Sequence, residues 1–363
     1  MLTSDEIRLI THLRRELHGS AELSNEERLT KAALVRFIKE HTSLEIRDMG
    51  KWFYAVHDEG EAKTTAVRAD FDAVKVGCAA RHLCGHDGHS AALCGLALLL
   101  ERHRVGSNVI LLFQHAEETG DGAKECLRLF DIEKVDRMIG CHNIPGAPMG
   151  TVLLKRGTFA CASCGMETAF KGSPTHAAYP ENGVNPTQAI AQLALDIPKT
   201  VAELSKKYGC MTLSTPVGIK VGECAYGVAA SEGSLYLTLR SERTEALDEL
   251  VKAAGERAAA LAEEFGLELS VKLCDVFPAT QNDDALIDDL ESACRAALLP
   301  YYYQDVPFRW SEDFGHYTKC TRAAFFGLGS GENTPPLHTE GYEYPDELLP
   351  KAAETFYKLL KNI

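Results

Sequence analysis

The sequence predicts an α/β main domain that is interrupted by a smaller inserted α+β domain. The first half alternates helical and strand periodicities, which is typical of helix layers on a largely parallel sheet. The middle of the chain follows the order β-α-β-β-α-β, the ferredoxin-like arrangement. At 363 residues the chain is long enough for two domains. We expect a discontinuous catalytic domain over residues 1–165 and 276–363 and an insert over 166–275.

Capping and periodicity locate the elements of the first half. Thr3 and Glu6 have the spacing of a capping box. Apolar residues follow at every third or fourth position, which predicts a helix with one apolar face. Ser24 and Glu27 have the same spacing, which predicts a second helix to about Glu40. Later elements are expected as strands at 52–56, 64–69, 108–114 and 137–142, and as helices at 90–102 and 122–130.

The insert has its own rhythm. Strands are expected at 166–171, 211–221, 234–240 and 267–274, and helices at 186–208 and 244–264. Helix and strand patterns resume from Asp283 and end in a helix over 345–360. This return to alternating helices and strands indicates that the insert lies between the two halves of the main domain.

Composition excludes several classes of partner. The formal net charge is -14, which disfavours a nucleic-acid groove or an anionic membrane surface. The longest apolar run, 91–100, is too short to span a bilayer, and the N-terminus lacks the pattern of a signal peptide. We therefore expect a cytoplasmic protein whose 12 cysteines are reduced. Cys161 and Cys164 have redox-motif spacing, but no helix follows them, so they are interpreted as buried strand thiols.

The segment 81–89 is the most informative stretch of the chain. It reads Arg-His-Leu-Cys-Gly-His-Asp-Gly-His, with three histidines, one cysteine and one aspartate. Imidazole, thiolate and carboxylate are ligands of divalent transition metals. The alternative is a group of surface histidines beside one buried cysteine, because spacing alone does not establish a metal site.

Further polar side chains follow the ends of predicted strands. Asp70 and Asp72 follow one strand, Glu117 and Glu118 a second, and His142 a third, while His338 lies in a loop near the C-terminus. Each has an ordinary explanation by itself, as a solvated turn or a hydrogen-bonded loop histidine. Their recurrence at successive strand ends is the evidence, because the carboxyl ends of strands form the active edge of open α/β sheets.

Glu117 and Glu118 suit a division of labour. Where the strand breaks into the following turn, both side chains can converge on one cavity. One carboxylate can then hold metal while the other takes the proton of a metal-bound water, whose pKa is lowered to about 7.

At this point the chain resembles the amidohydrolase branch of the aminoacylase and carboxypeptidase-G type of metallopeptidase. This branch includes hippurate hydrolases, N-acetyl-diaminopimelate deacetylases and indole-acetyl amino-acid hydrolases. The resemblance rests on ordered segments along nearly the whole chain: 14–18 with 22–24, 68–73, 84–89, 113–118, 141–143, 171–172 with 176–180, 311–314 and 337–338.

The resemblance implies a zinc-peptidase-like catalytic domain with an inserted lid and dimerisation domain. It also implies two divalent ions per chain, zinc or manganese, with cobalt or nickel as alternatives. Carried over by position, Glu117 would be the general base and then the acid, and Asp72 would orient a metal ligand. Cys84 would bridge the two metals as thiolate, and the full ligand set would be Cys84, His86, Glu118, His142 and His338.

Two lid residues complete the implied site. His176 would donate a hydrogen bond to the amide oxygen as charge develops, and Arg240 would pair with a substrate carboxylate. An exposed strand-end charge is the alternative interpretation of Arg240, and a part for Asp70 stays open. The chain departs from the family pattern at His115, Lys75, Glu181 and Asn185, of which the last two place substrate specificity in most doubt.

The sequence thus predicts a metal-dependent hydrolase that cleaves the amide of an N-acyl amino acid or a small peptide-like conjugate. A non-catalytic metal- or ligand-binding homologue and a structural zinc protein are the alternatives. Closed structural zinc sites use paired short spacings, whereas most ligands here come from distant strand ends. A homodimer or higher homo-oligomer is expected through an exposed lid edge strand.

Overall fold

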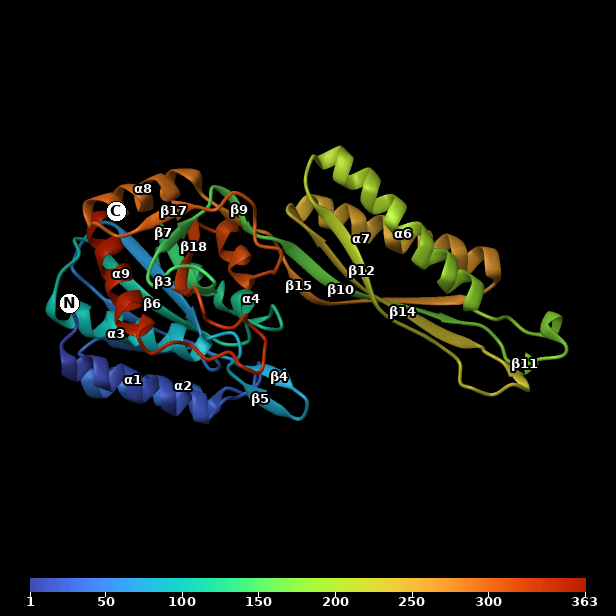
Figure 1. Ribbon diagram of the computed structural model, residues 1–363, viewed down its shortest axis with the longest axis horizontal. Helices are drawn as coiled ribbons and strands as arrows, with labels where there is room; N and C mark the ends of the chain where they lie inside the picture. The colour runs from blue at the N-terminus through green and yellow to red at the C-terminus, as the bar shows by residue number, and fades with distance from the viewer. The chain divides into compact units, whose positions relative to one another are not determined.

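The computed structural model describes all residues, 1–363, and they form two compact units (Figure 1). Unit 1 consists of Met1–Phe159, Thr280–Pro307 and Asp313–Ile363. Unit 2 consists of Ala160–Ala279 and Phe308–Glu312. None of the helices has the length and hydropathy needed to cross a membrane.

Unit 1 is built on an eight-stranded mixed sheet. Four central strands run parallel to one another, so their carboxyl ends lie at the same edge. Their side chains are mostly buried, as expected for strands covered on both faces. In spatial order the strands are β1 (Glu45–Asp48), β2 (Phe53–His57), β6 (Asn108–Gln114), β3 (Thr64–Asp70), β7 (Arg137–Pro145), β18 (Arg322–Gly331), β8 (Val152–Leu154) and β17 (Tyr301–Tyr303).

One helix, α3 (His86–Arg102), is the centre of the helical packing in unit 1. Its residues from His86 to Leu100 are all buried, and it contacts α1, α2, α9 and β3 (Figure 1). The other helical elements of the unit are α1 (Ser4–Gly19), α2 (Arg28–His41), α4 (Gly122–Cys126), α5 (Leu129–Ile132), α8 (Asp284–Ala296), η2 (Asp313–Lys319) and α9 (Leu348–Asn362). Short strand pairs complete it: β4 (Val74–Val76) with β5 (Ala79–Arg81), and β9 (Gly157–Ala160) with β16 (Thr280–Asn282).

Two helical predictions are wrong in detail. The pattern at Ser24 does not cap a helix: α2 begins at Arg28, and Glu27 makes no side-chain cap. The Ser24 hydroxyl instead donates a charge-assisted hydrogen bond to the buried carboxylate of Asp72, with 2.7 Å between Oγ and Oδ2. The helix expected over 122–130 is divided into α4 and α5.

Unit 2 has the predicted β-α-β-β-α-β order. Its elements are β10 (Ala162–Lys171), α6 (Thr187–Tyr208), β12 (Thr212–Val221), β14 (Glu232–Ser241), α7 (Thr244–Phe265) and β15 (Glu268–Phe277). The strands form an antiparallel sheet in the order β12-β14-β10-β15, and both helices share one buried apolar cluster with it. A separate short pair, β11 (Thr175–His176) and β13 (Val228–Ala229), lies with η1 (Pro180–Asn182). The α/β fold class is therefore confirmed.

Close packing of α3 makes Gly88 indispensable, which gives a first prediction. A Cβ at position 88 would lie 2.2 Å from the ring of Tyr344, which is itself buried. Gly88→Ala should therefore destabilise the protein by about 1–3 kcal/mol, measured by urea unfolding. Gly255→Ala in the interior of α7 is the matched control, because its Cβ would meet no atom within 4 Å. Equal stability of the two variants would show that the helix does not depend on this contact.

Candidate functional site

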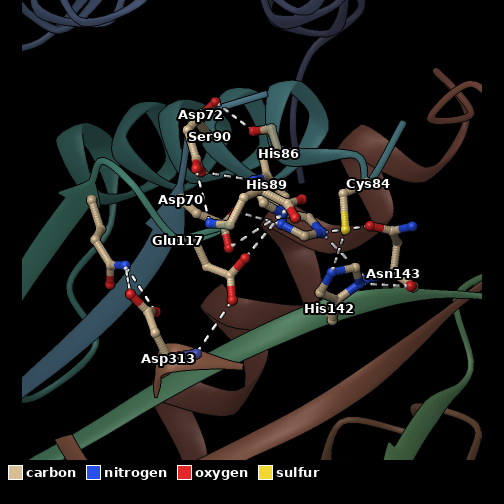
Figure 2. Close-up of polar contacts among 12 residues, drawn as sticks. Asp70, Asp72, Cys84, His86, His89, Ser90, Glu117, His142, Asn143 and Asp313 are labelled. Carbon is tan, nitrogen blue, oxygen red and sulfur yellow. Dashed lines mark hydrogen bonds and ion pairs between the residues drawn. The ribbon is translucent and has the colours of Figure 1, made fainter. Parts of the chain in front are cut away.

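The candidate site lies at the carboxyl edge of the central parallel strands in unit 1. Asp70 ends β3 and Asp72 follows it, while Glu117 and Glu118 lie in the turn after β6. His86 is the first residue of α3. The sequence predicts a strand that ends near His142, whereas β7 continues past it to Pro145. Figure 2 shows side chains from these separate segments pointing toward one another.

The structure brings all five expected metal ligands into one cluster. His86, Glu118 and Cys84 each belong to more than one group of possible ligand atoms. Within each group the atoms all lie within 4.8 Å of one another, and the groups are Cys84–His86–His142, Asp70–His86–His89, Cys84–Glu118–His338 and His86–Glu117–Glu118. Since the groups share members, the donors form one connected cluster.

Two buried atoms in this cluster have no hydrogen-bond partner. They are His86 Nε2 and Glu118 Oε1, which lie 3.7 Å apart. His338 Nε2 lies 3.6 Å from the same glutamate oxygen. A buried polar atom without a partner costs about 1–3 kcal/mol, so a cation between these atoms would remove a substantial penalty. The donor set therefore fits a divalent metal.

Asp72 orients two of the donors. Its Oδ1 accepts a hydrogen bond from His86 Nδ1 at 3.0 Å, so the lone pair of His86 lies on Nε2, facing the cluster. Its Oδ2 accepts from the backbone N–H of Glu118 at 2.9 Å. His142 is oriented similarly, because its Nδ1 donates to the Asn143 carbonyl at 2.9 Å and its Nε2 lies 3.4 Å from Cys84 Sγ.

A further polar chain lies behind the cluster (Figure 2). His89 Nδ1 bonds Asp70 Oδ1 at 2.6 Å, and His89 Nε2 lies 2.5 Å from Asn143 Oδ1. The Asn143 amide in turn donates to the Tyr342 hydroxyl at 2.6 Å. The sequence alone does not assign Asp70 a role or point to His89 and Tyr342, although two aspartates at a strand end and several histidines at a helix start were a usable signal.

The turn that carries both glutamates is built from unusual local structure. The backbone of Ala116 has a φ of 48°, a left-handed conformation that residues other than glycine rarely adopt. Its N–H donates to Glu27 Oε1 at 2.8 Å, and its carbonyl accepts from Gly122 at 3.0 Å. Gly122 must be glycine, since a Cβ there would lie 1.7 Å from the His115 carbonyl oxygen. These contacts hold the backbone so that both following carboxylates face inward.

Glu117 and Glu118 converge on the same imidazole nitrogen. Glu117 Oε2 lies 4.0 Å from His86 Nε2, and Glu118 Oε1 lies at 3.7 Å. The other oxygen of Glu117 accepts a hydrogen bond from the backbone N–H of Asp313 at 3.2 Å. The two neighbouring carboxylates thus approach one imidazole nitrogen while having different partners.

Burial changes the acid–base properties of the donors. Burial raises the pKa of the Cys84 thiol well above its usual value, and the charge of Glu118 adds to the effect. Burial raises the pKa of Glu118 to about 7, although nearby His86 opposes the shift. Burial lowers the pKa of His142, which favours the neutral imidazole that binds metal. A bound cation would favour the ionised thiolate and carboxylate.

Two of the expected site residues belong to unit 2. His176 is an exposed residue of β11, and its Nδ1 accepts a hydrogen bond from the Ala178 N–H at 3.1 Å. Arg240 lies on β14 and donates to the Arg309 carbonyl at 2.9 Å and to Ser311 Oγ at 3.0 Å. No carboxylate forms an ion pair with Arg240, and burial lowers the pKa of its guanidinium.

Comparison with known proteins identifies the family. Residues 62–362 match the model of peptidase family M20/M25/M40. An N-acetyl-L-cysteine deacetylase of Bacillus subtilis is 28% identical, with 97% of this chain and 87% of the relative covered. A putative aminohydrolase from methicillin-resistant Staphylococcus aureus has a TM-score of 0.88 at 22% identity, with 99% of this chain and 97% of the other covered. A dinuclear metal-binding M20 peptidase from Bacillus subtilis has a TM-score of 0.80 at 23% identity, with 99% and 98% covered.

The similarities to the two solved structures concern the fold, whereas the match to the family model concerns the sequence itself. Both cover the segments that carry the donor cluster. The chain therefore belongs to peptidase family M20/M25/M40 and, within its amidohydrolase branch, is a metal-dependent amidohydrolase or peptidase.

Proposed function

We propose that this protein hydrolyses the amide bond of N-acyl amino acids or similar small conjugates. The observation that carries the proposal is the convergence of Glu117 and Glu118 on His86 Nε2 beside Cys84. This arrangement offers metal ligands and a separate carboxylate within one cluster. A similar deacetylase of N-acetyl-L-cysteine supports an acylated amino acid as the substrate class.

Two divalent ions would be held by the five clustered donors. Cys84 belongs to two of the donor groups, one with His86 and His142 and one with Glu118 and His338, which would allow its thiolate to serve both ions. The other ligands in this proposal are His86, Glu118, His142 and His338. When bound, such ions polarise the amide carbonyl and make water acidic at neutral pH. Thiolate with imidazole favours zinc, while the carboxylate also accommodates manganese, cobalt or nickel.

Glu117 would handle the proton. Its Oε1 is occupied by the Asp313 N–H, so Oε2, which faces His86, is the oxygen that takes the proton of the attacking water. The same oxygen then delivers that proton to the leaving nitrogen. Asp72 would maintain the geometry by holding His86 and the Glu118 backbone.

The lid residues would recognise the substrate. Because His176 Nδ1 accepts the Ala178 N–H, its own proton lies on Nε2, which can donate to the amide oxygen. Arg240 has no acidic partner, so its guanidinium can bind the carboxylate of the amino-acid part.

Self-association through the lid is part of the proposal. The edge strand β12 exposes Val217 at 64% and Ile219 at 56%, and the other edge strand, β15, exposes Val271 and Leu273 at 42% each. Apolar, unpaired sheet edges favour strand pairing with a second copy. Light scattering that detects only monomer at working concentration would contradict this part.

Metal binding should be linked to proton release. The raised pKa values of Cys84 and Glu118 mean that metal must displace protons at neutral pH, so apparent affinity should fall as pH decreases through 7. Each displaced proton should cost about a tenfold loss of Zn²⁺ affinity per pH unit, so the protons of Cys84 and Glu118 together should cost about a hundredfold per unit below 7, measured by calorimetry in buffers of different ionisation enthalpy. Cys84→Ser should weaken Zn²⁺ binding. Cys94→Ala is the control and should leave it unchanged, because burial alone shifts the pKa of Cys94 and no charged group of the donor cluster contributes. Affinity independent of pH would contradict the ligand assignment.

Removal of the proposed base tests the mechanism. Glu117→Gln keeps the shape and the contact with Asp313 but cannot take a proton, so kcat should fall about 100- to 10,000-fold. Metal content should stay near wild type, since Glu117 is not one of the proposed ligands. The assay is release of free amino acid from a panel of N-acyl amino acids with added Mn²⁺ or Zn²⁺. Full retained activity would refute the role of Glu117, and a wild-type protein inactive on the whole panel would favour a non-catalytic homologue.

Arg240 should act on substrate binding rather than on turnover. Arg240→Ala should raise KM for N-acyl amino acids by about 10- to 100-fold, the effect expected for a lost charged hydrogen bond. The same variant should change little for analogues in which the carboxylate is an amide. Arg243→Ala is the control, since this neighbouring arginine is exposed. An unchanged KM in Arg240→Ala would assign Arg240 a structural role only.

A further inference from the structure

A buried arginine, Arg68, belongs to the hydrogen-bond network next to the proposed base, Glu117. The Arg68 side chain on β3 is almost completely buried, with only 2% of the residue exposed. Its Nη1 donates to Asp70 Oδ2 and its Nη2 donates to Asp313 Oδ1, each at 2.6 Å. Its Nε donates to Gln114 Oε1 at 2.9 Å. The planar guanidinium therefore joins two strand ends to the segment at Asp313.

Asp313 is held from several directions. Its Oδ2 accepts from Gln114 Nε2 at 2.7 Å and from the Ala123 N–H at 2.8 Å. Its Oδ1 accepts from Arg68 and, at 2.9 Å, from Gln114. The Tyr317 hydroxyl completes the network by donating to Gln114 Oε1 at 2.6 Å. With its side chain bonded in this way, the peptide of Asp313 has little freedom to move.

That peptide touches the proposed base. The Asp313 N–H donates to Glu117 Oε1 at 3.2 Å, the contact drawn in Figure 2. One carboxylate oxygen is thereby fixed, and the other faces His86 Nε2. Proton transfer requires the base within hydrogen-bond reach of its water, so the orientation of this carboxylate sets the rate.

We propose that Asp313 is a positioning residue, clamped by Arg68 and Gln114, that aims Glu117 through its backbone N–H. The inference rests on the proposed function, since it assumes that Glu117 is the base. Buried ion pairs contribute little net stability, because desolvation offsets their attraction, so the pair of Arg68 and Asp313 is better explained by the geometry that it imposes. Asp313 touches neither substrate nor metal in this proposal and acts only through Glu117.

Asp313→Asn tests the clamp with the least change of shape. An amide nitrogen in place of Oδ2 would face the Ala123 N–H and Gln114 Nε2, both donors, so the 313 peptide must shift. We expect kcat about 10- to 100-fold lower, KM within about threefold of wild type and unchanged metal content. The double variant D313N/Q114E offers an acceptor to the new amide and should recover part of the lost kcat.

Thr65→Val is the matched control. Thr65 lies on the same strand as Arg68, and its Oγ1 accepts a buried bond from Arg137 Nε at 2.7 Å. The variant should lower the unfolding temperature and leave kcat unchanged. If Thr65→Val loses as much kcat as Asp313→Asn, or if Asp313→Asn loses metal together with activity, the network is structural and the proposal is overturned.

A second variant decides the question if Asp313→Asn does not fold. Gln114→Met keeps the volume and removes the donor to both Asp313 oxygens, while Arg68 and Ala123 still bond the carboxylate. A smaller loss of kcat at constant KM supports the clamp, and an unchanged kcat overturns it. Glu117→Gln assayed in parallel separates the two ideas. If that variant is active, the proposed base is wrong. If it is inactive while Asp313→Asn is fully active, only the positioning role fails.

Discussion

The site depends on one buried carboxylate, that of Asp72. It bonds the His86 ring, the Glu118 backbone and the Ser24 hydroxyl, and so joins three segments that are distant in sequence. A buried carboxylate is stable only when such donors surround it, which makes their relative positions mutually dependent. The imidazole of His86 and the turn of the two glutamates are consequently held in one arrangement before any substrate arrives.

The parallel sheet explains why so much of the cluster was predictable. Asp72 and Glu118 follow the ends of adjacent strands, and parallel strands place their ends at one edge. The cysteine and histidines of residues 84–89 are local in sequence and open a buried helix between two of those strands. The α/β class and the order of elements in the insert could be predicted because a helix or strand with one buried face has apolar residues at regular spacing in the sequence.

The remaining contacts left no such trace. Ser24 has the spacing of a helix cap, and only the folded chain shows that its hydroxyl donates to a buried carboxylate and that the helix begins later, at Arg28. Arg68 and Asp313 are separated by 245 positions, so neither predicts the other. The left-handed backbone of Ala116 is equally unpredictable, since nothing about alanine favours a positive φ. Tertiary contacts determine these features, and these features orient the carboxylate of the proposed base, Glu117.

The two units carry different parts of the proposed chemistry. Unit 1 holds the donor cluster and the proposed base, whereas unit 2 offers His176 on the short pair β11 and β13 and Arg240 on the four-stranded sheet. Changes in unit 2 can alter substrate recognition while the donor cluster in unit 1 stays intact. Substrate specificity is therefore expected to depend on residues of unit 2.

The central claim is that Cys84, His86, Glu118, His142 and His338 surround a pair of metal ions. Anomalous diffraction from a crystal of the zinc-loaded protein, recorded on both sides of the zinc edge, measures this directly. The account predicts two neighbouring peaks, with Cys84 Sγ between them and Glu117 outside the first ring of ligands. Strong peaks elsewhere in the chain, or none among these five side chains at full zinc loading, would contradict it.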